Sequence, residues 1–160
     1  MTHDASTSAT PARFTASPEL SAQLQQVLVD LIALSLQGKQ AHWTLVGRNF
    51  RDLHLQLDEI VDQAREYSDT IAERMRALGA VPDGRAGTVA QTTSLAVFPL
   101  GEPDTLETAG LITERLWRVT GTVRGVHDAV DAEDPTTADL LHVVIEGLEK
   151  QAWMLGAETR

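Results

Sequence analysis

Apolar residues recur at alternating intervals of three and four along four long segments of this chain, and this pattern decides which folds are open to it. Such spacing places the apolar side chains on one face of an α-helix. A helix with one apolar face has to bury that face against other helices. Four such helices pack as a bundle in which neighbouring axes cross at about 20°. The four apolar series run over residues 20–41, 53–78, 109–130 and 140–155.

Capping residues and glycines indicate where each helix begins and ends. Ser17, followed by a proline, is a favoured helix start, and Gly79 is a natural helix stop. Asp134, also followed by proline, is a second favoured start. The sequence therefore predicts a helix from residue 17 to about 46, a second over 49–78, a third from about 104, and a fourth over 136–157.

A long connection separates the second predicted helix from the third. Residues 80–103 contain three prolines and three glycines, and a short helix is expected within them at residues 88–97. The other two connections are short, and a single long crossover is typical of ferritin-like bundles. We therefore predict an all-α, ferritin-like four-helix bundle over residues 17–160. Residues 1–16 are small and polar and are expected to form a flexible tail.

The overall composition narrows the possible function. The formal net charge of −10 argues against a general nucleic-acid binder and favours attraction of cations. No cysteine is present, so neither a disulfide nor a thiolate zinc site is expected. The sequence has no run of about 18 apolar residues that could form a membrane span, and no signal peptide is visible. Together these features indicate a cytoplasmic protein.

Four metal-capable residues form one stripe on the second predicted helix. Taking His54 as zero on a helical wheel, Asp58 lies near ~40°, Asp69 near ~60° and Glu73 near ~100°. This stripe runs beside the apolar one, at the edge of the folded chain. The helical rise separates Asp58 and Asp69 by roughly 16 Å, so one metal ion cannot contact both carboxylates of one chain.

The stripe is symmetric about its own midpoint near Gln63. His54 and Glu73 lie equally far from that point, and so do Asp58 and Asp69. An antiparallel copy of the helix crossing there would bring the His54 end of one chain opposite the Glu73 end of the other. A twofold axis would repeat the arrangement and give two identical sites. The other interpretation is an ordinary solvated helix face.

His42 is a fifth candidate ligand, because the turn after it can fold its side chain back towards His54. Two neutral imidazoles with carboxylates suit iron, manganese or zinc. A zinc-binding or other small-ligand helical protein without redox activity therefore stays open at this point.

These residues resemble the ferroxidase motif of the Dps family, a branch of the ferritin superfamily. The motif is His42-Trp43, then His54 and Asp58, then Asp69 and Glu73, with offsets of 12, 4, 11 and 4. The stretches FRDLHLQLDE, DTIAERMRALGAVP, FPLGEPD and LEKQAWML strengthen the resemblance, which covers roughly residues 20–156.

The resemblance implies a hollow homo-dodecamer with 23 symmetry that oxidises Fe(II), preferably with hydrogen peroxide, and stores the ferric mineral. Each di-iron ferroxidase centre would take His42 and His54 from one subunit and Asp69 and Glu73 from its neighbour. Asp58 would ligate or orient a second, weaker metal position. Trp43 would be a sacrificial electron donor or a hydrophobic shield, with core packing as the alternative.

Other residues have less specific readings. Glu133, Asp134 and Asp139 resemble the acidic lining of the family's threefold pore for iron uptake, although Asp134 is also expected to cap a helix. His127 and His142 are expected to be lone structural or surface histidines. His3, in the tail, is expected to have no role. Trp117 and Trp153 are expected to be packing residues.

The chain departs from the family in its tail. Many members bind DNA through a lysine-rich terminal segment, whereas residues 1–16 contain Arg13 alone among lysines and arginines. Direct DNA binding is therefore doubtful, and salt should abolish what remains. The alternative function is a nucleoid-associated protein that compacts DNA with little oxidase activity.

Overall fold

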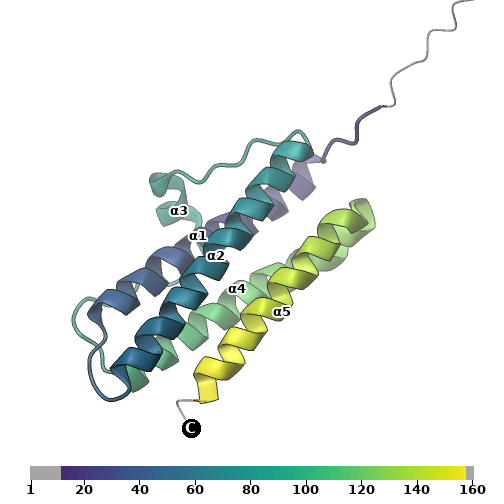
Figure 1. Ribbon diagram of the computed structural model, residues 1–160. Helices are drawn as coiled ribbons and strands as arrows, with labels where there is room; N and C mark the ends of the chain where they lie inside the picture. Colours follow the sequence, from purple (N-terminus) through teal and green to yellow (C-terminus); the bar gives the residue numbers. More distant parts are fainter. Residues whose placement is uncertain (1–11, 158–160) are drawn as a thin grey trace, which may run out of the picture.

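The computed structural model describes residues 12–157, which contain four long helices and one short helix (Figure 1). The helices are α1 (Pro18–Thr44), α2 (Phe50–Ala77), α3 (Ala86–Thr92), α4 (Thr105–Glu133) and α5 (Pro135–Ala157). The predicted helices therefore exist, in the predicted order. The short helix α3 begins two residues before its predicted start at residue 88. Helix α1 ends two residues before its predicted end near residue 46. No helix in the described residues is long and apolar enough to cross a membrane.

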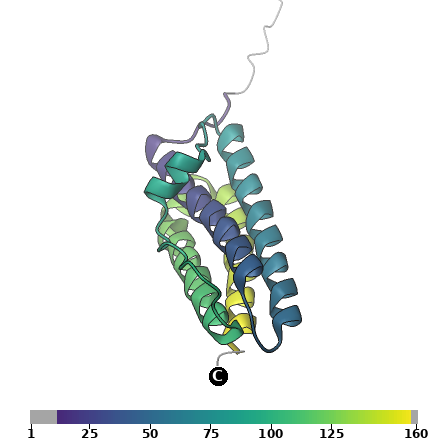
Figure 2. The same cartoon turned by 90° about the vertical axis from the view of Figure 1, so that its left-hand side faces the viewer.

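The bundle consists of two helix pairs joined by the crossover. α1 packs against α2, and α4 against α5, while α1 also packs against α4 (Figure 1). The crossover with α3 runs along the outside of α1, which Figure 2 shows from the side. It ends where the backbone N–H of Val46 donates to the carbonyl of Pro103 at 3.1 Å. This connection returns the chain to the end of the bundle where the α1–α2 turn lies, as a ferritin-like topology requires.

A close approach of α1 to α2 occurs at Gly38. A Cβ placed on this glycine would lie 2.9 Å from Cγ2 of Val61, which is closer than real Cβ contacts come. Both residues are buried among the predicted apolar stripes. Gly38 is one turn before His42, so the glycine fixes the spacing of the two helices next to the predicted metal ligands.

Residues 12–16, part of the predicted tail, contact the end of α2. Nε of Arg13 donates to the carbonyl of Ala77 at 3.2 Å, and Nη2 donates to the carbonyl of Arg76 at 3.2 Å. The N–H of Ala16 donates to the carbonyl of Leu78 at 2.9 Å. A cation at this place satisfies carbonyls that have no partner within the helix and complements the helix dipole. Residues 1–11 and 158–160, including His3, lie outside the described part.

A buried carboxylate attaches the crossover to the bundle. Asp30 is fully buried, and it accepts hydrogen bonds from the N–H of Ser94 at 2.7 Å and from the hydroxyls of Ser94, Thr93 and Thr122 at 2.8–2.9 Å. These donors come from the crossover and from α4. Asp30 therefore connects three segments that the sequence alone does not bring together.

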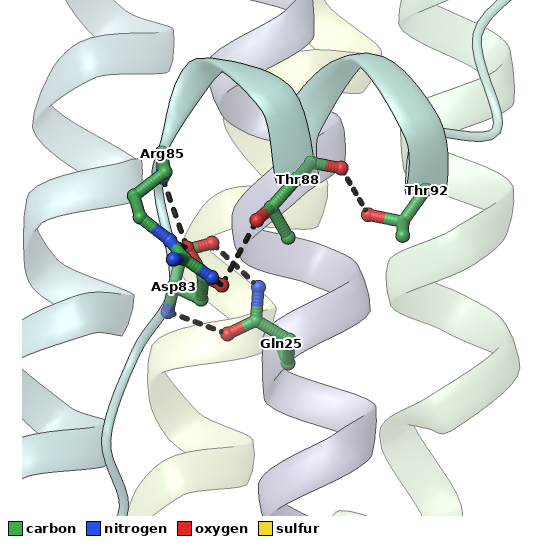
Figure 3. A network of polar contacts seen from close by, with 5 residues as sticks. All are labelled: Gln25, Asp83, Arg85, Thr88 and Thr92. Carbon is green, nitrogen blue, oxygen red and sulfur yellow. Dashed lines mark hydrogen bonds and ion pairs between the residues drawn. The ribbon is translucent and has the colours of Figure 1, made fainter.

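A second network fixes the start of α3. Gln25 of α1 exchanges two hydrogen bonds with the backbone of Asp83, at 2.8 and 2.9 Å (Figure 3). The Asp83 carboxylate accepts from the Arg85 guanidinium at 2.6 and 2.9 Å and from the Thr88 hydroxyl at 2.9 Å (Figure 3). These bonds, led by the one from Arg85, hold the pKa of Asp83 well below its ordinary value of 3.8. The carboxylate thereby anchors the first turn of α3.

We expect the contribution of Asp83 to stability to depend on pH. A depressed pKa means that the carboxylate stabilises the fold above its unfolded pKa, and that this stabilisation is lost as the pH falls below about 4. Asp83→Asn should lower the melting temperature at pH 7, and the difference from the wild-type protein should shrink on acidification. Thermal unfolding at several pH values measures this. An equal difference at every pH would contradict the role assigned to the ionised carboxylate.

Candidate metal centre

The rings of His42 and His54 stack on each other where α1 ends and α2 begins. Their centroids are 3.6 Å apart and the ring planes are inclined by 22°. The turn between the helices contains two residues with left-handed backbone, Gly47 at φ 117° and Asn49 at φ 57°. These conformations favour glycine and asparagine. The turn therefore folds His42 back onto His54, as predicted.

Hydrogen bonds determine which nitrogen of each ring is free. Nδ1 of His42 lies 2.9 Å from the carbonyl oxygen of His54, and Nδ1 of His54 lies 3.0 Å from that of His42. A carbonyl oxygen only accepts, so each Nδ1 must carry the hydrogen. In the neutral ring Nε2 then keeps its lone pair, which is the form that binds a metal ion. Both imidazoles therefore have Nε2 as the nitrogen that is free to accept.

Phe50 extends the stack, and its part in the site was missed from the sequence. Its ring lies 5.0 Å from that of His54, inclined by 28°. Since Phe50 is the first residue of α2 and lies four positions before His54, helical spacing could have indicated this contact. Phe50 restricts the rotation of the His54 ring.

Asp58 lies beside the histidines but is already paired. Its carboxylate accepts a short hydrogen bond from Nζ of Lys39 and lies 3.3 Å from Nδ1 of His42. The Lys39 hydrogen bond lowers the pKa of Asp58 against the opposing effect of burial, and the nearby His42 and His54 add to the lowering. Asp58 is therefore ionised, and the ammonium group of Lys39 is already paired with its carboxylate.

Lys39 was not predicted as a site residue. It precedes His42 by three positions on α1, which places both side chains on one helix face. That spacing alone does not reveal that the lysine reaches Asp58 on the neighbouring helix.

Asp69 and Glu73 are exposed on α2, one turn apart, and the structure does not bring them to the histidines of the same chain. Within the described residues, no three histidine, cysteine or acidic side chains come close enough together to hold a metal ion. A single chain thus places the two imidazoles together, next to an Asp58 that is paired with Lys39, and places the carboxylates of Asp69 and Glu73 elsewhere.

The three tryptophans lie at the surface. Trp43, next to His42, is 69% exposed, which excludes packing in the core of this chain. Trp117 and Trp153 are 49% and 68% exposed, so the prediction that they are packing residues is wrong for the single chain. Their side chains are therefore accessible for contact with another molecule.

Two of the predicted pore residues make contacts within the chain. Glu133 accepts from the N–H and hydroxyl of Ser17, at 2.8 and 2.7 Å. Asp134 is buried and pairs with Arg74 at 2.7 Å. Burial alone would raise the pKa of Asp134. Hydrogen bonds from Thr137 and Arg74 outweigh this effect and bring the pKa below its ordinary value.

Asp139, the third predicted pore residue, is exposed, with its carboxylate 3.8 Å from Nδ1 of His142. Asp134 links the end of α4 to the start of α5, as its predicted capping role requires.

A hollow of about 490 Å³ lies at the α1–α2 turn and the first turns of α2 and α4, and no predicted metal ligand lines it. The metal-capable residues lie instead on α1 and α2, with Asp69 and Glu73 exposed to solvent. This arrangement suits a site that a second molecule completes.

Known proteins resemble this chain over most of its length. A family model described as a ferritin-like domain matches residues 21–160. A DNA protection during starvation protein of Agrobacterium fabrum is 35% identical over 138 residues, which are 86% of this chain and 85% of the relative. DNA protection during starvation protein 2 of Deinococcus radiodurans is 35% identical over 92% of this chain, which spans only 61% of that relative. The structure of Dps from Microbacterium arborescens in the high iron form has a TM-score of 0.80 and 35% identity, with 91% of this chain and 97% of that one covered.

Proposed function

The chain belongs to the Dps family of the ferritin superfamily, and from this premise we propose that it is a ferroxidase and iron store. It would oxidise Fe(II) with hydrogen peroxide, or with O2, at sites shared between two subunits. The ferric product would be stored inside a hollow dodecamer with 23 symmetry. The Microbacterium arborescens relative, whose structure is that of a high iron form, supports iron as the metal.

The observation that carries the proposal is the division of ligands within one chain. His42 and His54 present two Nε2 lone pairs side by side, while Asp69 and Glu73 point to solvent at a distance from them. The donor set fits the metal, since imidazole and carboxylate together suit iron. A second subunit, placed antiparallel along α2, would supply the two missing carboxylates to each histidine pair.

The residues of the site have separate tasks in this scheme. The two imidazoles bind Fe(II), and the carboxylates of the neighbouring subunit stabilise the ferric product better than imidazoles do. Two Fe(II) ions give one electron each, so that one hydrogen peroxide and two protons become two water molecules. No hydroxyl radical is released in this reaction. Trp43, exposed next to His42, is placed to shield the centre or to donate an electron to a stray oxidant.

Lys39 would limit occupation of the second metal position at Asp58. We expect Lys39→Met to free the Asp58 carboxylate and to strengthen binding of the second divalent ion by roughly tenfold, the lower end of the range for neighbours of metal ligands. Calorimetric titration with Co2+ under anaerobic conditions measures this. Lys150, the only other lysine, is exposed on α5, and Lys150→Met is the matched control. Equal second-site affinities in the two variants would show that Lys39 does not compete for Asp58.

Protection of DNA would then come from removal of iron and peroxide. In the described part of the predicted tail, the one cation, Arg13, is engaged with the carbonyls that end α2, so it is not free for a DNA phosphate. Arg85 is likewise paired with Asp83. If DNA compaction, the second candidate function, were the role of this protein, the protein would retain DNA in a gel-shift assay near physiological salt. We expect no retention there.

The direct test adds Fe(II) and then peroxide to the protein under anaerobic conditions and follows the ferric absorbance. We expect oxidation of two Fe(II) per peroxide and a twelvefold mass by light scattering. Oxidation no faster than in buffer would refute the ferroxidase. A dimeric mass together with rapid oxidation would support the shared centre but contradict storage inside a hollow shell.

A further inference from the structure

His127 on α4 and His142 on α5 form a second pair of facing imidazoles. Their ring centroids are 4.4 Å apart and the planes are inclined by 30°. The two residues were expected to be lone histidines, but α4 and α5 run side by side after the short turn that joins them, and this packing brings the rings together. Both rings come from the same subunit.

One buried nitrogen of this pair has no hydrogen-bond partner. Nδ1 of His127 lies 3.2 Å from a carboxylate oxygen of Asp128, and a carboxylate only accepts, so Nδ1 carries the hydrogen. Nε2 then keeps its lone pair in the neutral ring. This Nε2 is closed off from solvent and makes no hydrogen bond. A buried polar atom without a partner is unusual in a native protein and calls for an explanation.

The other ring of the pair is more exposed. The side chain of His127 is 19% exposed, whereas that of His142 is 62% exposed. Nδ1 of His142 is 3.8 Å from Asp139, which is too far for a hydrogen bond. The exposed ring of His142 is therefore not held by this carboxylate and is free to turn beside the His127 ring.

We propose that His127 and His142 bind a divalent transition-metal ion of the borderline class, such as Zn2+, Co2+ or Ni2+, at a site separate from the shared centre. Neutral imidazole is the ligand that these ions prefer among the residues present. Asp128 holds the His127 ring through Nδ1, in the way that carboxylates orient metal-binding histidines. No third such side chain in the described residues joins them closely enough, so water completes the coordination.

This site does not depend on the proposed ferroxidase. The pair on α1 and α2 needs carboxylates from a second subunit, whereas His127 and His142 supply both nitrogens from one chain. The acidic chain, with a net charge of −10, also concentrates cations near its surface.

The test uses the full-length protein in its native assembly with His42→Ala and His54→Ala, which removes the imidazoles of the shared centre. Calorimetric titration with Zn2+ should still show one site per chain. Adding His142→Gln should weaken that site by at least about tenfold. Val143→Ala, at the next exposed position on α5, is the matched control and should leave the affinity unchanged. With Co2+ as the probe, His142→Gln should also change the visible absorption of the bound ion.

His142→Gln is the deciding variant because a substitution at a side chain that is 62% exposed should leave the fold intact. An unchanged Zn2+ affinity in this variant, or no Zn2+ bound by the protein that lacks the other two histidines, would overturn the proposal. Loss of iron oxidation in the background protein tests only the shared centre, so the two proposals fail independently.

Discussion

Mixing two inactive variants is expected to restore iron oxidation. His54→Ala removes an Nε2 ligand, and Glu73→Ala removes a carboxylate that one chain cannot bring to its own histidines. Each variant alone should oxidise Fe(II) at least about a hundredfold more slowly, because even the neighbours of metal ligands contribute up to that factor. In a mixed dimer one site lacks both residues, and the other site has both of them.

The size of the recovery follows from the twofold axis. Random pairing makes half of the dimers mixed, so roughly a quarter of all sites regain the full ligand set. The measurement is the initial rate of ferric absorbance after the variants are dissociated, mixed and reassembled. A mixture of His54→Ala with His42→Ala is the matched control, because both substitutions fall on the same half of the site and no pairing repairs it. Recovery in neither mixture would contradict a centre that is shared between two chains.

Asp30→Ala is expected to have the largest effect on stability. The buried carboxylate accepts from Ser94, Thr93 and Thr122, and its removal leaves the N–H of Ser94 without this acceptor. Hydrogen bonds to a charged group contribute about 1.5–3 kcal/mol each, so we expect a loss of about 3 kcal/mol or more in the free energy of unfolding. Chemical unfolding at matched protein concentration measures the loss.

Hydrogen exchange at the Ser94 amide locates the effect. That N–H donates to Asp30 at 2.7 Å and should lose its protection in the variant. Asp131→Ala, at an exposed carboxylate of α4, is the control and should change stability by less than about 0.5 kcal/mol. Retained protection at Ser94 would show that the crossover is held by other contacts.

The long helices could be predicted because their signals are local. Apolar spacing and caps such as Ser17, which accepts from the N–H of Leu20 at 3.0 Å, depend only on helix geometry. The start of the short helix could not be predicted as well. It depends on Asp83 and Gln25, which are 58 positions apart and meet only in the folded chain.

In the candidate site, too, features set by one helix could be predicted, whereas contacts between helices could not. The wheel positions of His54, Asp58, Asp69 and Glu73 follow from one helix, and the turn that returns His42 follows from its glycine. Contacts between different helices were missed, namely Lys39 with Asp58 and His127 with His142. Periodicity gives the direction of a side chain around its own axis but not the neighbour that it meets on another helix.

Arg13 affects how experiments on the N-terminus should be designed. Its guanidinium closes the end of α2, the helix that carries four of the five predicted iron ligands. A truncation that starts the protein at residue 17, made to ask whether the tail binds DNA, would also remove the hydrogen bonds that Arg13 and Ala16 donate to the end of that helix. Shortened proteins should therefore keep residue 12 onward, so that a change in iron handling is not mistaken for an effect of the missing tail.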